Sequence, residues 1–76
     1  MNGIPLSELE KIINDYGNFI KYYTKVTNNL ELTNNYHKLK QLGITLRDNK
    51  YVQENLPFIS HTIDCCLTKA KEKYYS

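Results

Sequence analysis

The hydrophobic positions in the first part of the chain repeat with the period of an α-helix. They step alternately by three and four residues, which places them on one side of a helix. The positions are Leu9, Ile12, Tyr16, Phe19, Tyr23, Val26 and Leu30. Ile13 and Ile20 are expected to widen this stripe, and Ser7 and Glu10 have the spacing of a capping box. The pattern predicts a long amphipathic helix over about residues 7–29.

A second stripe lies in the last third of the chain and continues across a proline. Its positions keep the helical spacing and are Val52, Leu56, Ile59, Ile63, Cys66 and Ala70. Proline lacks an amide proton, but the first turn of a helix does not need one. Pro57 is therefore predicted to start a helix over about residues 57–74, with a kink or a tight break before it.

Two shorter helices are predicted between the long ones. The first spans about residues 34–42, with Thr33 as its N-cap. Gly43 suits the left-handed position that follows a last turn, so a Schellman-type stop is expected there. The second short helix is expected over about residues 46–55.

These elements predict an all-α fold in which residues 1–76 form a single domain. No segment alternates between apolar and polar residues as a strand would. The two long helices are expected to pack antiparallel in a small helical bundle. A chain of 76 residues lies near the lower size limit for a self-sufficient core, and short middle helices cannot cover both stripes. A homodimer is therefore expected.

Charge and composition exclude some classes of protein and suggest an origin. The net charge of +2 is too small to predict a polyanion partner by itself. The two cysteines are adjacent and close no loop, and neither an export signal nor an apolar run long enough for a membrane span is visible. A cytoplasmic protein with free thiols and no membrane contact is expected. The bias toward Asn and Lys is typical of a low-GC bacterium, its phages or some eukaryotic parasites.

The stretch HTIDCCL gathers residue types that bind metals or perform redox chemistry. On a helix, Cys66 falls inside the apolar stripe, whereas His61 and Cys65 face each other on the opposite side. They supply only half of a zinc site, and completing it would take His37 or Asp64. A nucleophile pair would also need an oxyanion pocket and an orienting group. We expect no metal, no cofactor and no enzymatic activity.

Residues 34–56 resemble a helix-turn-helix, with Gly43 at the turn. In that alternative the protein is a DNA-binding regulator whose second helix contacts phosphates or base edges. Two positions depart from the motif: Leu39 stands where a small residue is usual, and Asn49 where a buried aliphatic is usual. The candidate nucleic-acid contacts are Arg47, Asn49, Lys50 and Gln53.

The function favoured by the sequence is that of a small protein–protein interaction module. The chain contains seven tyrosines, more than so small a core requires, and tyrosine is enriched at protein interfaces. A regulator, inhibitor or adaptor, plausible for a phage or another mobile element, would dock one helical face on a partner protein of unknown identity. The candidate contact residues are Tyr22, Tyr51, Phe58, His61 and Cys65.

Overall fold

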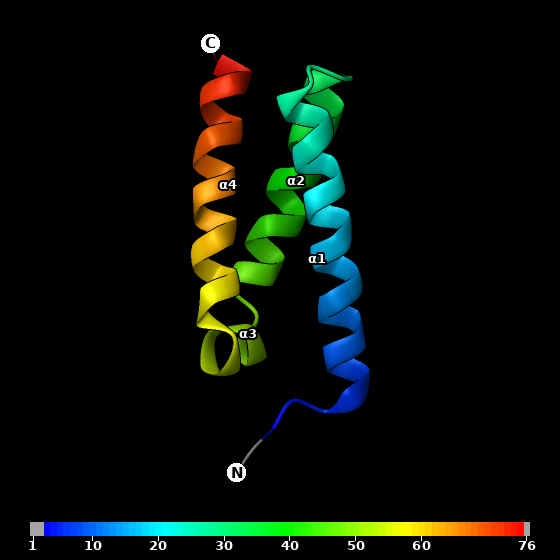
Figure 1. The fold of residues 1–76 in the computed structure, drawn as a ribbon, viewed down its shortest axis with the longest axis vertical. Coiled ribbons are helices and arrows are strands. Elements are labelled where there is room, and N and C mark those ends of the chain that lie inside the picture. Colours follow the sequence, from blue (N-terminus) through cyan, green and yellow to red (C-terminus); the bar gives the residue numbers. More distant parts are fainter. Residues whose placement is uncertain (1–2, 76) are drawn as a thin grey trace.

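The computed structural model describes residues 3–75, and every element over that range is a helix. The helices are α1 (Leu6–Thr27), α2 (Leu32–Arg47), α3 (Lys50–Asn55) and α4 (Pro57–Tyr75). Two long helices at the ends of the chain enclose two shorter ones, and they pack as a small bundle 45 Å long (Figure 1). The predicted all-α fold class is confirmed.

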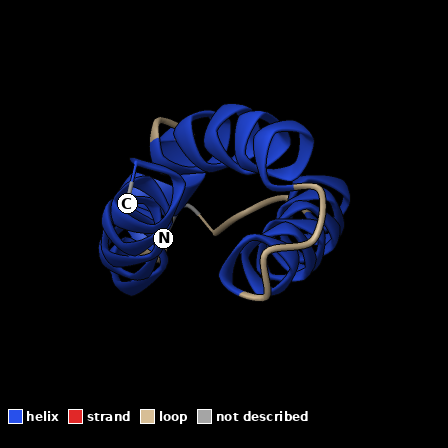
Figure 2. Ribbon diagram, turned by 90° about the horizontal axis from the view of Figure 1, so that it is seen from above, coloured by secondary structure: helices blue, strands red, loops and turns tan. Residues whose placement is uncertain are grey.

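The direction of the last helix differs from the prediction. α1 and α4 run parallel to each other, and α2 runs antiparallel to both (Figure 1). The reason is the length of α2: its 16 residues span about 24 Å, enough to carry the chain back along α1. α2 lies between α1 and α4 and packs against each of them. Viewed along the long axis, the three helices form an arc that is open on one side (Figure 2).

Gly43 does not end a helix, so the predicted stop at this residue is wrong. α2 continues through it, and its backbone is not left-handed. A Cβ atom at Gly43 would lie 2.7 Å from Cε1 of Phe19, 3.1 Å from Cδ2 of Leu67 and 3.3 Å from Cγ2 of Ile63. The glycine lets α1 and α4 approach α2 closely, and this packing outweighs the low helix propensity of glycine.

The Schellman motif occurs instead at the end of α1, where Asn29 is left-handed with φ of 60°. The amide of Leu30 donates to the carbonyl of Lys25 at 2.9 Å, and the amide of Asn29 donates to that of Val26 at 3.1 Å. The buried side chain of Asn35 donates to the Leu30 carbonyl at 2.7 Å. Asparagine tolerates the left-handed region better than most residues, which explains why the turn lies here.

The two N-terminal caps predicted for the first two helices are wrong. α1 begins at Leu6, directly after Pro5, so Ser7 lies inside the helix and no side chain caps its amides. α2 follows a left-handed Glu31, and Thr33 is its second residue, not its N-cap. Pro5 thus precedes the start of α1, and the left-handed Glu31 precedes the start of α2. Neither residue belongs to the usual N-cap signature.

The segment predicted as one helix over residues 46–55 is divided at Asn49. The Asn49 side chain accepts hydrogen bonds from the amides of Tyr51 at 2.8 Å and Val52 at 3.2 Å, which starts α3 as an N-cap. The predicted tight break before Pro57 is confirmed, because α4 starts at that proline only two residues after α3 ends.

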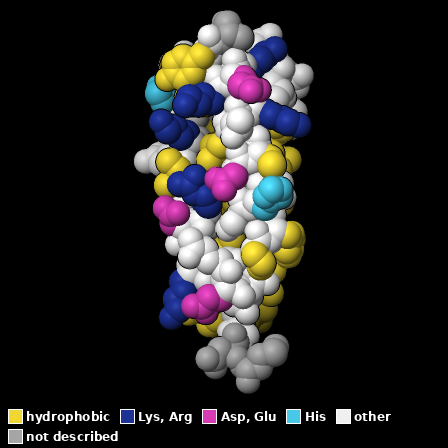
Figure 3. Space-filling model, turned by 90° about the vertical axis from the view of Figure 1, so that its left-hand side faces the viewer, with side chains coloured by type: hydrophobic (Ala, Val, Ile, Leu, Met, Phe, Trp, Pro, Cys, Tyr) yellow, Lys and Arg dark blue, Asp and Glu magenta, His cyan; other side chains and the backbone are white. Residues whose placement is uncertain are grey.

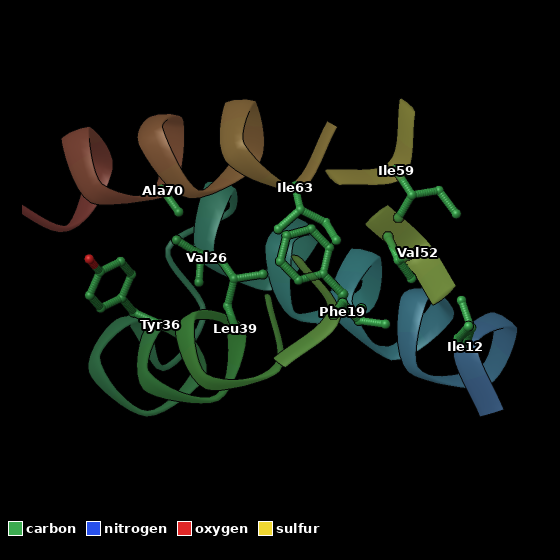
Figure 4. Close-up of a cluster of buried hydrophobic side chains, with 10 residues drawn as sticks. Ile12, Phe19, Val26, Tyr36, Leu39, Val52, Ile59, Ile63 and Ala70 are labelled. Atoms are coloured by element: carbon green, nitrogen blue, oxygen red, sulfur yellow. The ribbon is translucent and has the colours of Figure 1, made fainter. Parts of the chain in front are cut away.

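The core fills the space between α1, α2 and α4, with Val52 of α3 closing one end (Figure 4). Along α1, every seventh residue of the predicted stripe is buried. Over the described residues, the core side chains are Ile12, Phe19, Val26, Tyr36, Leu39, Leu46, Val52, Ile59, Ile63 and Ala70. The stripe predicted for the last third of the chain is confirmed, because all of its members are buried or half-buried.

Three hydrophobic members of the predicted first stripe are exposed. Ile13 is 62 % exposed, Ile20 is 37 % exposed and Leu30 is 54 % exposed. Leu30 follows the Schellman turn and so leaves the helix. Ile13 and Ile20 lie on the flank of α1 that neither α2 nor α4 covers. A helical wheel gives the direction of a side chain but cannot tell how much of a wide stripe the neighbouring helices will cover.

Candidate interaction surface

Three of the five predicted contact residues share the outer side of α4. Phe58 is 65 % exposed, and His61 and Cys65 are exposed one helical turn apart. Cys65 Sγ lies 3.8 Å from His61 Nε2. Cys66 is half-buried and packs against the core, so the predicted opposite directions of the two cysteines are confirmed.

The two thiols are expected to differ in reactivity because their surroundings differ. Burial raises the pKa of the Cys66 thiol, and the neighbouring Cys65 raises it further. Lys69 acts in the opposite sense but is the smallest of the three influences. Since the thiolate is the nucleophile, Cys66 is protected from alkylation at neutral pH both by its low accessibility and by its low degree of ionisation.

Iodoacetamide is expected to modify Cys65 first. In the folded protein at neutral pH, mass spectrometry should find the label on Cys65, and labelling of Cys66 should become substantial only as the pH rises above the ordinary thiol range. In urea the two residues should react at similar rates. Faster labelling of Cys66 in the folded protein would contradict the assigned orientation of α4.

The other two predicted contact residues lie elsewhere. Tyr22 is half-buried beside α2, with the Lys38 ammonium 5.7 Å from the centre of its ring. Tyr51 is half-buried on α3 and packs against the core. The structure therefore brings together Phe58, His61 and Cys65 but not the two tyrosines, whose apolar surface is partly used inside the chain.

Three of the four residues of the nucleic-acid alternative serve local structure. Arg47 Nη1 donates to Asp64 at 3.1 Å, and this hydrogen bond raises the pKa of the guanidinium. Asn49 caps α3, and Gln53 Nε2 donates to the Arg47 carbonyl at 3.1 Å. Lys50 is exposed at the start of α3, which has only six residues. The turn on which the helix-turn-helix prediction rested lies inside α2.

The residues considered for a metal site do not converge. His37 packs at the C-terminal end of α4, with its ring centre 6.1 Å from that of Tyr74, whereas His61 lies in the second turn of α4. Asp64 is paired with Arg47 across to α2. Within residues 3–75, no three His, Cys, Asp or Glu side chains gather closely enough to hold a metal ion.

An apolar surface lies on the flanks of α1 and α4 that face away from α2. The sequence interpretation had assigned three of its residues, Ile13, Ile20 and Cys66, to the core. Asn18 and Tyr22 of α1 line a depression shared with α2, and Asp64 and Lys71 of α4 line another. Helical geometry places the remaining flanks on the open side of the arc (Figure 2). These flanks carry Leu6, Ile13 and Ile20 on α1 and Phe58, Thr62 and Cys66 on α4; together they are called the open face below.

The open face concentrates exposed apolar side chains. Leu6 is 70 % exposed and, with Ile13 and Ile20, forms a line at every seventh residue of α1. On the side of the molecule formed by α4, hydrophobic side chains gather along one edge of the lower half, whereas most of the Lys and Arg side chains on this side lie in the upper half (Figure 3). The seven-residue repeat beside the buried repeat of Ile12 and Phe19 was the sequence signal for this surface.

Comparison of the chain with protein-family models, curated proteins and solved structures finds no match. Over residues 3–75, none of the helices combines the length and the apolar character needed to cross a bilayer.

Proposed function

We propose that this chain is a small, non-enzymatic protein–protein interaction module that docks its open face on an apolar helix face of a partner protein. The observation that carries the proposal is the line of Leu6, Ile13 and Ile20 on α1, flanked by Phe58 on α4. Single exposed apolar side chains are common on protein surfaces, but an aligned set on one face is typical of an interaction site.

The size of this surface supports reversible binding. Full burial of a leucine or isoleucine side chain contributes about 1.5–3 kcal/mol. Given their exposed fractions, Leu6, Ile13 and Ile20 together offer about 2.5–5 kcal/mol. A partner that buries a similar apolar area would double this contribution to about 5–10 kcal/mol. This gain is comparable with the cost of association, about 4–15 kcal/mol, so the expected complex is specific in geometry and weak.

The shape and chemistry of the open face favour a helix as the docking element. On α1 its exposed residues are seven positions apart, which is two turns of the repeat with which one helix packs along another. The half-buried Thr62 and the outer edge of the half-buried Cys66 add small, uncharged surface on α4. The contact surface offered is therefore long, narrow and largely apolar, and an amphipathic helix presents the matching surface.

Substitution on the open face is expected to abolish capture of a partner. A tagged wild-type chain is used as bait in native lysate to which untagged chain has been added, next to Ile13→Asp and Asn14→Asp. Asn14 is exposed on the same helix but away from the open face, so its variant matches the added charge. Wild type and Asn14→Asp should retain the same protein in stoichiometric amount, and Ile13→Asp should lose it. Equal retention by all three baits would contradict the proposal.

A further inference from the structure

The directions of α1 and α4 favour one direction for a helix that packs on the open face. α1 and α4 run parallel and bound the open side of the arc (Figures 1 and 2). Neighbouring helices in bundles with short connections usually run antiparallel. A helix that packs against both α1 and α4 is therefore expected to run opposite to both. Within residues 3–75 the chain has no further helix to supply it.

The spacing on α1 is symmetric about Ile13. Leu6 and Ile20 lie seven residues before and seven residues after it, so an antiparallel copy of α1 centred on Ile13 meets the same pattern. Ile13 then faces Ile13 of the second copy, and Leu6 faces its Ile20. A two-fold axis perpendicular to the helices produces this pairing and no other element is needed.

Along the long axis of the bundle, Phe58 of α4 lies near the level of Ile13 of α1. Ile63 and Phe19 both lie against Gly43, and Ala70 lies beside Val26 (Figure 4). Because α1 and α4 are parallel, these pairs place Phe58, five residues before Ile63, close to the level of residue 14 of α1. The exposed apolar side chains of both helices thus meet around the position where the two-fold axis would pass.

The area sets the strength of such a pairing. Residues 6–20 form 15 positions of α1 and span about 22 Å, and α1 with its α4 neighbour is about 20 Å wide. The contact therefore covers on the order of 450 Å² per copy, below the roughly 800 Å² per partner of a standard stable interface. A contact of this size fits a weak dimer that forms only as the protein concentration rises. The small core of each chain is consistent with it, because short domains often gain stability from a second copy.

We infer that the partner of the open face is a second copy of this chain, with the two α1 helices packed antiparallel about Ile13 and Phe58 of each copy beside them. This inference rests on the proposed function, because it names the occupant of the same surface. The dimer buries the line of exposed apolar side chains and gives α1 a second antiparallel neighbour besides α2.

Sedimentation equilibrium over a wide concentration range tests the inference. The average mass of wild type should rise from 9.0 kDa toward twice that value as the concentration increases. Ile13→Asp should weaken the dimer at least about a hundredfold, because two carboxylates then meet at the axis. Asn14→Asp should sediment as wild type does. A wild type that stays at 9.0 kDa at every concentration, or an Ile13→Asp variant that dimerises normally, would overturn the inference.

Charge complementation tests the register and also shows that the variants fold. Ile13→Asp and Ile13→Lys should each be monomeric alone, since like charges face each other across the axis. An equimolar mixture of the two should regain a dimer of mixed composition, because opposite charges then meet. Two monomeric variants whose mixture stays monomeric would show that residue 13 does not face its own counterpart.

The outcomes separate this inference from the proposed function. A monomeric wild type that still captures another protein through Ile13 overturns the second copy as occupant and leaves the docking surface standing. A monomeric wild type that captures nothing through Ile13 overturns both. A dimer lost in Ile13→Asp and restored by mixing supports both.

Discussion

Replacing Gly43 with leucine is expected to unfold the bundle under conditions in which the wild type is folded. A Cβ atom alone would lie 2.7 Å from Cε1 of Phe19, so the remaining atoms of a leucine have no space between α1, α2 and α4. Overpacking of a closed core costs about 1–3 kcal/mol for small insertions and more for large ones. A domain of this size has a free energy of unfolding of only about 4–11 kcal/mol, so the loss is a large fraction of the total.

Alanine substitutions at two glycines provide the matched comparison. Gly43→Ala should lower the free energy of unfolding, because the clash with Phe19 outweighs the gain in helix propensity. Gly17→Ala should raise it by about 0.5–1 kcal/mol, because Gly17 is exposed inside α1 and a Cβ atom there meets nothing within 4 Å. Urea denaturation followed by far-UV circular dichroism, in dilute protein, measures both changes. Stabilisation by Gly43→Ala would contradict the close approach of α1 to α2.

Phe19→Ala is the second change with a large expected effect. The Phe19 ring is fully buried, stacks on Tyr16 with ring centres 6.3 Å apart, and fills the space in front of Gly43. Truncating a buried phenylalanine to alanine removes its transfer free energy and leaves a cavity, which together cost about 3–5 kcal/mol. The midpoint of urea denaturation should therefore fall strongly.

Phe58→Ala is the control for Phe19→Ala. It makes the same chemical change in a side chain that is 65 % exposed at the start of α4. Measured at a protein concentration where the chain is monomeric, it should change the free energy of unfolding by no more than about 0.5 kcal/mol. Similar losses for the two variants would mean that Phe19 is not the centre of the core.

The sequence predicted the helices well where burial alone determines the pattern. The repeat of Ile12, Phe19 and Val26 in α1 and the repeat from Val52 to Ala70 both lie where expected. The orientation of the two cysteines followed from the same periodicity. Such predictions succeed because a buried face must be apolar at every turn.

The path of the chain could not be predicted because it depends on one glycine and one asparagine. The local sequence around each of them is compatible with more than one backbone conformation. Gly43 has the sequence context of a helix stop, but its lack of a side chain serves the contact with Phe19. Asn29, which lies within the predicted range of the first helix, makes the left-handed turn instead. Extending α2 through Gly43 turns α4 parallel to α1, and that change leaves Ile13 and Ile20 uncovered.

The candidate surface was found only in part for the same reason. Phe58, His61 and Cys65 were selected because they fall off the apolar stripe, and α4 does hold them on one exposed side. Ile13 and Ile20 fall on the stripe and were therefore assigned to the core. Their exposure depends on which helices are neighbours in space, and helical periodicity alone does not give those neighbours.

The central claim, that Ile13 and Ile20 lie in water in the isolated chain and are covered on association, is tested most directly by isoleucine methyl NMR with a soluble paramagnetic chelate. In dilute protein, the methyls of Ile13 and Ile20 should be relaxed strongly and those of Ile63 hardly at all. As concentration rises, Ile13 and Ile20 should become protected while Ile44, exposed on α2, keeps its relaxation rate. Ile13 and Ile20 methyls that are protected even in dilute protein, or that stay as accessible as Ile44 at every concentration, would contradict the account.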